Sequence, residues 1–364
     1  MREYNRLRDV YMDVVKSRYR DQGARTLLVA ACLVIIVAGL RAARAILLPF
    51  LVSILLAIIS LPLMAWLQKK RFPTTLAVLC TVVVDVAVLA GLVLVVGQSL
   101  NQFTDVMPRY QDRLKELLGL LLTWLDANGI TLDNPEALDV FNPSSMLDLV
   151  GRTLSAVANM LSNTFLVVLT TVFILFEAAG FSRKLSIAFG DRQKHLDRFA
   201  VMARQVQRYL VMKTIISLAT GLLAGILVAA LGISFPLLWG IIAFLFNFIP
   251  NLGSIFAAVL PVLLALVQFG PGKAISVAIG YLIINIVLAN LVEPYLMGRR
   301  LGLSTLVVFL SLAFWGWVWG PVGMLLSVPL TMIVKIGLEN IDGFRWVAVL
   351  LDANPHGTVT KSKN

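Results

Sequence analysis

Charged side chains are scarce in this chain, because only 14% of its 364 residues are Asp, Glu, Lys or Arg. A soluble globular protein normally carries about 25%. Hydrophobic residues make up 59% of the sequence, and its mean hydropathy is +0.87. This composition excludes an ordinary soluble domain and predicts a polytopic membrane protein.

Residues that usually carry chemistry are also rare. Both cysteines, Cys32 and Cys80, lie in apolar runs without other ligands at metal spacing, which favours small buried hydrophobes over a disulfide or a metal site. The Gly272-Lys273 pair lacks the flanking residues of a Walker A loop, so ATP is not the expected energy source. No nucleophile lies beside a base. We therefore expect no enzyme activity, cofactor or metal.

The net charge of +11 does not indicate nucleic-acid binding, because the basic residues flank the apolar segments. Their distribution gives the orientation through the positive-inside rule. Of the 31 Lys and Arg residues, 24 become cytoplasmic if the segments 1–26, 69–71, 183–213, 299–300 and 335–364 are inside. We therefore predict a multi-pass membrane protein with both termini in the cytoplasm.

Hydropathy and charge divide the chain into seven segments. A basic amphipathic N-terminal helix is followed by three transmembrane segments, an extracytoplasmic helical insert and a fourth span. A basic cytoplasmic amphipathic helix, a transport core of two span-plus-hairpin units and a cytoplasmic tail complete the chain. The predicted boundaries are 1–26, 27–98, 99–154, 155–180, 181–208, 209–338 and 339–364.

The insert contains apolar residues at alternating spacings of three and four, which is the pattern of a coiled-coil seam. Pro108 is expected to kink or restart this helix. Two interpretations remain open: the helix packs within its own subunit, or the seam joins subunits in a homo-oligomer. The predicted seam consists of Leu100, Phe103, Met107, Tyr110, Leu114, Leu117 and Leu121.

Two stretches of the C-terminal half, 231–261 and 301–330, resemble copies of one unit. At an offset of 70 residues they share seven identities, including Gly253 with Gly323. The orientation above gives the two span-plus-hairpin units opposite topology, which is the arrangement of many secondary transporters.

The first unit is predicted to have its span at 209–232 and its hairpin at 236–269, and the second its span at 274–293 and its hairpin at 303–338. Each hairpin has a helix-breaking tip, at 250–253 and at 320–323. The arms are at or below the roughly 20 residues that cross a bilayer, which favours re-entrant hairpins. The tryptophans Trp315, Trp317 and Trp319 favour a full span instead, because Trp clusters mark membrane interfaces. Both interpretations remain open.

The stretches FNFIPNLGSIFAAVLPVLLAL at 246–266 and NLVEPYLMGRRLGLSTLVVFLSLAFWGWVWGPVGMLLSVPLTMIVKI at 290–336 closely resemble the autoinducer-2 exporter family of bacterial membrane permeases. Thr305 stands where many members carry Pro, and the segment that follows Ser304 resembles the exporter branch of the family. The resemblance implies an all-α integral protein of the bacterial inner membrane, with about seven or eight transmembrane segments. It also implies a homo-oligomer, with a pentamer as the candidate state, and export of autoinducer-2, a small polar furanosyl signal of quorum sensing.

Few polar residues lie inside the predicted spans, so the candidates for function are limited. Side-chain amides suit a polyhydroxylated solute because they donate and accept hydrogen bonds without a charge. Interhelical hydrogen bonding explains the same amides equally well. The predicted substrate path consists of Asn247, Pro250, Asn251, Gly253, Asn285, Asn290, Glu293, Pro294, Gly320, Pro321 and Gly323.

Two carboxylates are candidates for ion coupling. Asp85 lies at the centre of the 74–98 span, where a carboxylate is costly and is a functional candidate by default. An Asp that burial keeps neutral is the competing interpretation. Glu293 is predicted to pair with Arg299 or Arg300, as a gate or as a simple interfacial ion pair.

The sequence supports three functions, of which export of a small polar solute such as autoinducer-2 is preferred. The second is a sodium(lithium)/proton antiporter that uses Asp85 or Glu293. The third is an oligomeric membrane scaffold that transports nothing. The expected partners are the solute, membrane lipids and further copies of the chain, and no nucleic acid.

Overall fold

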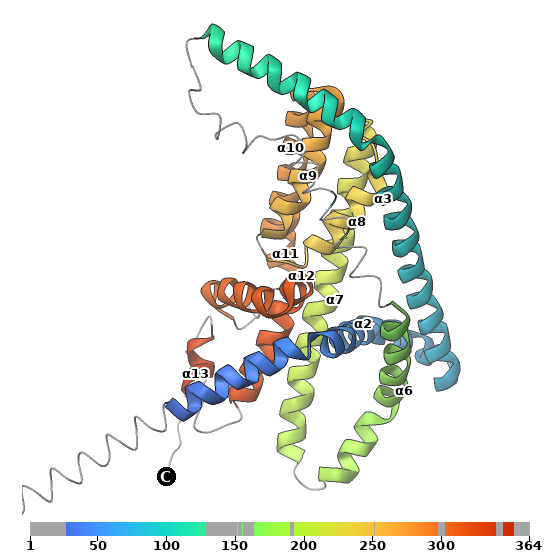
Figure 1. Cartoon of the computed structure of the whole chain (residues 1–364). Helices are drawn as coiled ribbons and strands as arrows, with labels where there is room; N and C mark the ends of the chain where they lie inside the picture. Colours follow the sequence, from blue (N-terminus) through green and yellow to red (C-terminus); the bar gives the residue numbers. More distant parts are fainter. Residues whose placement is uncertain are drawn as a thin grey trace, which may run out of the picture. The chain divides into compact units, whose positions relative to one another are not determined.

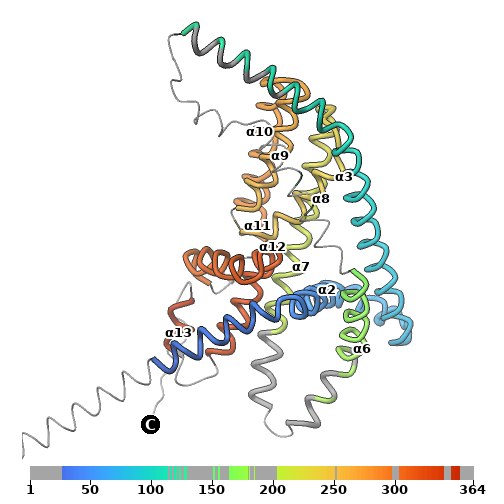
Figure 2. Tube along the Cα trace, in the orientation of Figure 1, coloured from blue at the N-terminus to red at the C-terminus, as the bar shows by residue number. Residues whose placement is uncertain are grey.

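The structure is a computed structural model that describes residues 27–128, 151, 155, 164–189, 193–250, 252–297, 303–339 and 345–352. Every regular element in these residues is a helix, which confirms the predicted all-α class (Figure 1). Figure 2 traces the same helices in sequence colours.

Two compact units divide the chain after Leu48. The first contains the apolar helix Leu27–Ala42, and α2 (Arg44–Lys69) begins in this unit. The second unit contains all the later helices. Within it, Arg71 joins α2 to α3 with a left-handed backbone (φ 67°), and Pro73 precedes the first residue of α3.

Helix α3 (Thr74–Ala127) is a single helix of 54 residues. The expected restart at Pro108 is wrong, because the helix continues through this proline; Figure 1 shows a curved helix. The predicted boundary between residues 98 and 99 therefore falls inside one helix. Four residues of the predicted seam have partners within the chain. Phe103 is buried in the main core, and Leu100, Met107 and Tyr110 pack against the same core.

Helix α6 (Thr164–Phe189) contacts α3 and α7. The Ser53 hydroxyl of α2 donates to the carbonyl of Val167, at 3.0 Å between the oxygens, and ties α2 to α6. Helix α7 (Gln193–Ala230) continues without a break through residues 208 and 209, where the sequence predicted a boundary.

The first hairpin consists of α8 (Pro236–Phe246) and α9 (Leu252–Phe269), which are the predicted limits 236–269. Pro236 is the first residue of α8, where the missing N–H of proline has no cost. Gly270 ends the hairpin with a positive φ of 84°, a conformation that glycine adopts without strain.

Helix α10 (Pro271–Asn285) continues into η1 (Ile286–Val292), a π-helix, and then into α11 (Glu293–Met297). Helix α12 (Thr305–Glu339) is the second hairpin, because Gly320 interrupts it with φ 68° and ψ −148°. The short α13 (Arg345–Leu350) packs against α12. Lys335 anchors this contact with an ion pair to Asp352, at 3.0 Å.

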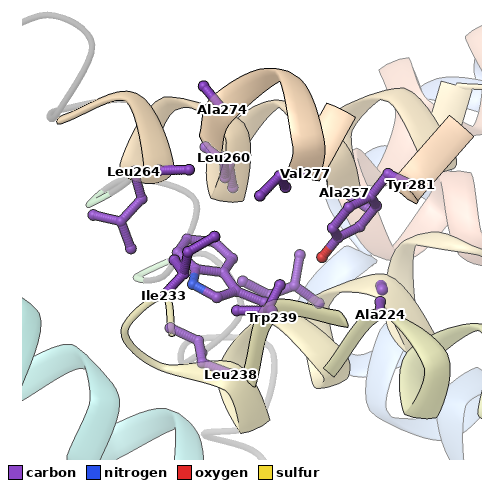
Figure 3. Close-up of a cluster of buried hydrophobic side chains, with 14 of the residues drawn as sticks. Ala224, Ile233, Leu238, Trp239, Ala257, Leu260, Leu264, Ala274, Val277 and Tyr281 are labelled. Carbon is purple, nitrogen blue, oxygen red and sulfur yellow. The ribbon is translucent and has the colours of Figure 1, made fainter. Parts of the chain in front are cut away.

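The main hydrophobic core lies among α7, α8, α9 and α10, and Figure 3 shows its side chains. Trp239 of α8 is fully buried in it and donates its indole N–H to the Ser234 carbonyl, at 2.9 Å. Gly221 of α7 and Gly240 of α8 let the two backbones approach, because a Cβ on Gly221 would lie 2.6 Å from the Gly240 carbonyl oxygen. The small residues therefore have a packing role here.

Six helices of the described residues are long and apolar enough to cross a membrane, and three shorter apolar helices accompany them. The expected count of seven or eight segments therefore stays a prediction. Helix α8 has 11 residues and a length of about 16 Å, far below the roughly 30 Å of a bilayer core.

Candidate functional site

A polar cavity of about 190 Å³ lies where α7, the first hairpin and the α10–α11 segment meet. Each of these elements contributes lining residues. The cavity is lined by Lys213, Asn247, Ile249, Pro250, Ser254, Asn285, Ala289, Asn290 and Glu293. Five of these nine residues belong to the substrate path predicted from the sequence.

The π-helix η1 explains how Asn285 and Asn290 reach the same cavity. Residues five apart in an α-helix point about 140° away from each other, because each residue turns the chain by 100°. In a π-helix the repeating bond joins residues five apart, so these residues lie on nearly the same face. The wide turns of η1 therefore direct both amides, which an α-helix would separate, to one cavity.

Lys213 and Glu293 form an ion pair at the cavity. The Lys213 ammonium donates to both carboxylate oxygens of Glu293, at 2.8 and 2.9 Å. The side chain of Lys213 is only 5% exposed, and that of Glu293 is 21% exposed. The pair joins the middle of α7 to the first residue of α11. A charge this deeply buried requires a partner, and each of these residues supplies it to the other.

The amides at the cavity differ in how far their hydrogen bonds are satisfied. Asn247 is buried and donates to the Ser217 hydroxyl, at 2.9 Å. Among the residues that the structure describes, the side-chain amides of Asn285 and Asn290 have no hydrogen-bond partner, and both are accessible. These two amides offer free donors and acceptors to a molecule in the cavity.

The hairpin tip is shaped by glycine. A Cβ on Gly253 would overlap the carbonyl oxygen of Phe246, so the tip closes only without a side chain at this position. In the second hairpin a Cβ on Gly323 would overlap the carbonyl oxygen of Trp315 in the same way. The predicted repeat therefore has matching backbone crossings at corresponding glycines.

The other described residues of the predicted path do not line this cavity. Pro294 follows Glu293 in α11 and is exposed. Gly320, Pro321 and Gly323 form the break of α12, where the buried Trp315 donates its indole N–H to the Thr331 hydroxyl, at 3.1 Å. Three predicted residues, Asn251, Arg299 and Arg300, lie outside the described residues.

Four lining residues were missed by the sequence analysis, and two of them, Lys213 and Ser254, have polar side chains. Lys213 was counted with the cytoplasmic basic residues, although it follows the start of the predicted 209–232 span. Its position within an apolar run was the available signal, because an intramembrane lysine needs a partner. Both oxygens of Glu293 accept from Lys213, so the structure gives Glu293 a partner other than the predicted arginines.

Asp85 lies away from the cavity, in the interface of α3 with α2. The Ser60 hydroxyl donates to one carboxyl oxygen of Asp85, at 2.7 Å. The other oxygen is buried and has no partner. Apolar side chains of α2, α3 and α6 form the neighbouring cluster of Ala57, Met64, Ala77, Val78 and Leu175.

Comparison with known proteins identifies the family. Residues 30–343 match the model of the AI-2E family transporter. The AI-2 transport protein TqsA of Escherichia coli (strain K12) is 40% identical over 329 residues, which cover 90% of this chain and 96% of that protein. A Haemophilus influenzae protein named "Putative transport protein" is 40% identical over 338 residues, with the same coverage of both chains. The chain therefore belongs to the AI-2E family of transporters.

Proposed function

We propose that the chain is a secondary transporter or facilitator that exports a small polar solute, with autoinducer-2 as the preferred substrate. The observation that carries the proposal is the polar cavity, where the unpartnered amides of Asn285 and Asn290 face a space beside a broken hairpin. Broken helices at a repeat are typical of transport sites. The printed name of TqsA supports the choice of substrate.

The size of the cavity fits this class of solute. A cavity of about 150 Å³ is known to hold a benzene ring, so about 190 Å³ has room for one small ring.

The short hairpin arm supports the re-entrant interpretation. Because α8 is too short to cross the bilayer core, a re-entrant first hairpin would hold Asn247 and Pro250 at membrane depth. Irregular backbone is tolerated there when it is covered by protein or lines a cavity. We propose that the second hairpin, with its tip at Gly320 and Pro321, lines the opposite end of the path in an inverted arrangement. We place the protein in the inner membrane with both termini in the cytoplasm.

A sodium/proton antiporter is the second candidate, because Glu293 brings a carboxylate to the cavity itself. In this mechanism a cation would compete with Lys213 for the carboxylate. Asp85 would then be a second site of protonation. Antiport predicts flux that requires sodium and a proton gradient and that Glu293→Gln abolishes.

The test is efflux of autoinducer-2 from liposomes containing the purified protein, with and without a proton gradient. We compare the wild type with Asn285→Leu and Asn290→Leu. Ser276→Ala is the matched control, because Ser276 is an exposed residue of α10 that does not line the cavity.

We expect the two cavity variants to lose at least about 90% of the efflux, a change of roughly 1.4 kcal/mol or more, and the control to keep it. Equal rates in all four proteins would refute the cavity as the transport site. Sodium-driven proton movement without efflux would favour the antiporter.

A further inference from the structure

The cavity has two ionisable residues among its described lining side chains, and their charges are opposite. Lys213 and Glu293 carry one charge each, and the remaining lining residues are neutral. Because the ammonium contacts both carboxylate oxygens, the pair presents no net charge to the cavity.

This pairing determines what a charged solute would meet. An ion that enters the cavity loses water, and an unpaired charge of opposite sign would offset that loss most strongly. Neither charge of the pair is free, since each already neutralises the other. An uncharged solute loses far less and can use the amides of Asn285 and Asn290.

We propose that the Lys213–Glu293 pair is a charge filter, which makes the cavity selective for uncharged polyhydroxylated solutes over anions and cations of the same size. The inference rests on the proposed function and adds the charge class of its substrate. It assigns Lys213 and Glu293 as specificity-determining residues. Removal of either partner leaves the other charge unpaired. The site then prefers solutes whose charge is opposite to the charge that remains.

A structural role for the pair makes a different prediction. If the pair only fastened α7 to α11, its removal would slow the transport of every solute by the same factor. A charge filter instead changes the ratio between solutes of different charge. The ratio is therefore the quantity to measure, because loss of protein or of folding leaves it unchanged.

The experiment uses the full-length protein in liposomes and two solutes of matched size. D-ribose is an uncharged sugar that forms a furanose ring, and D-ribonate is the corresponding anion. The variants are Glu293→Gln, Lys213→Gln and the double variant with both changes. Uptake of each labelled solute is measured separately, and the ribonate-to-ribose ratio is calculated for each protein.

We expect the wild type to transport ribose and to exclude ribonate. In Glu293→Gln, where Lys213 is unpaired, the ratio should rise at least about tenfold, which corresponds to ~1.4 kcal/mol. The double variant should return to the wild-type ratio, since its site is neutral again. In Lys213→Gln, where Glu293 is unpaired, the uptake ratio of the cation 1-amino-1-deoxy-D-ribitol to ribose should rise. This variant gives a second test if Glu293→Gln does not fold.

A ratio that stays at the wild-type value in both single variants would overturn the charge filter, even if wild-type transport is normal. Failure of the proposed function has a different signature, because the wild type would then move neither autoinducer-2 nor ribose. In that case the filter is tested by calorimetric binding of ribonate to the purified proteins. Tighter binding to Glu293→Gln than to the wild type supports the filter, and equal binding refutes it.

Discussion

Gly253 and Gly323, which are 70 residues apart in the sequence, close the two hairpins through similar contacts, although the carbonyls they meet differ by one position in the repeat. At each position a Cβ would overlap a backbone carbonyl oxygen of the preceding arm, that of Phe246 or that of Trp315. Both glycines are buried, so the crossing cannot relax into open space. This shared geometry supports the interpretation of the hairpins as two copies of one unit.

Replacing either glycine with alanine should therefore destabilise its hairpin. For Gly253→Ala and Gly323→Ala we expect a loss of about 1–3 kcal/mol, the range for overpacked sites. Thermal unfolding of the purified protein in detergent gives the measurement. Gly91→Ala is the control, because a Cβ on Gly91 meets nothing within 4 Å and alanine favours a helix. Unchanged melting of both tip variants would contradict the tight crossing.

The register of η1 can be tested by changing its length. Deletion of the exposed Val287 should convert the π-helix to an α-helix and bring Asn285 and Asn290 to a spacing of four, which is again one face. We expect this variant to keep solute flux within about a factor of three of the wild type, a change of less than ~1 kcal/mol.

Insertion of one alanine after Val287 is the matched comparison. It should rotate Asn290 and Glu293 by about 100° relative to α10 and separate Glu293 from Lys213. We expect flux to fall to background, as measured in the same liposomes. If the deletion variant lost its flux and the insertion variant kept it, the register of η1 would not be what positions Asn290 and Glu293.

Asp85 should tolerate an amide better than an apolar residue. In Asp85→Asn the amide oxygen can still accept from the Ser60 hydroxyl, which Asp85→Leu leaves without an acceptor. An unpaired buried hydroxyl costs about 1–3 kcal/mol, so we expect the Leu variant to melt at a lower temperature than the Asn variant. Transport by Asp85→Asn that is equal to the wild type would exclude Asp85 as the coupling carboxylate.

The outer part of the predicted seam can be tested for assembly. The seam residues Leu100, Phe103, Met107 and Tyr110 pack within the chain, whereas the side chains of Leu114, Leu117 and Leu121 lie outside the described residues. If these three join subunits, as the sequence predicts for a homo-oligomer, Leu114→Asp and Leu121→Asp should lower the mass of the assembly. Light scattering of the detergent-solubilised protein gives the mass.

The control for assembly is Leu120→Asp, because Leu120 is on the same helix, lies off the predicted seam and is 61% exposed. Its mass should equal that of the wild type. If all these proteins had the same mass, the seam would pack only within its own subunit, or the subunits would contact each other through another surface.

Local signals in the sequence predicted the hairpins well. Proline marks the first residue of α8, and glycine follows the last residue of α9, so the predicted limits 236–269 agree with the structure. Five of the cavity residues were also predicted, because polar amides and a carboxylate are conspicuous in apolar segments. The substrate, the oligomer and the orientation stay predictions.

Other features depend on geometry that local sequence does not contain. The partner of Glu293 is 80 positions away on α7, and only packing brings Lys213 beside it. The π-helix inserts one residue into the register of a helix, which apolar periodicity over so short a segment does not reveal. Pro108 was expected to kink or restart the helix, and α3 does not restart there, because packing of its neighbours against the core offsets the lost backbone hydrogen bond.

The continuity of α3 has a mechanical consequence. A helix of 54 residues is about 80 Å long, more than twice the hydrocarbon thickness of a membrane. Tyr110 accepts a hydrogen bond from Gln268 of α9, at 2.7 Å, so this long helix is attached about two thirds of the way along to the hairpin that lines the cavity. In a bilayer of different thickness, the part of α3 that lies in the membrane would tilt. This tilt would move the other end of α3 and displace the hairpin through that hydrogen bond. The thickness of the lipid bilayer should therefore change the rate of transport.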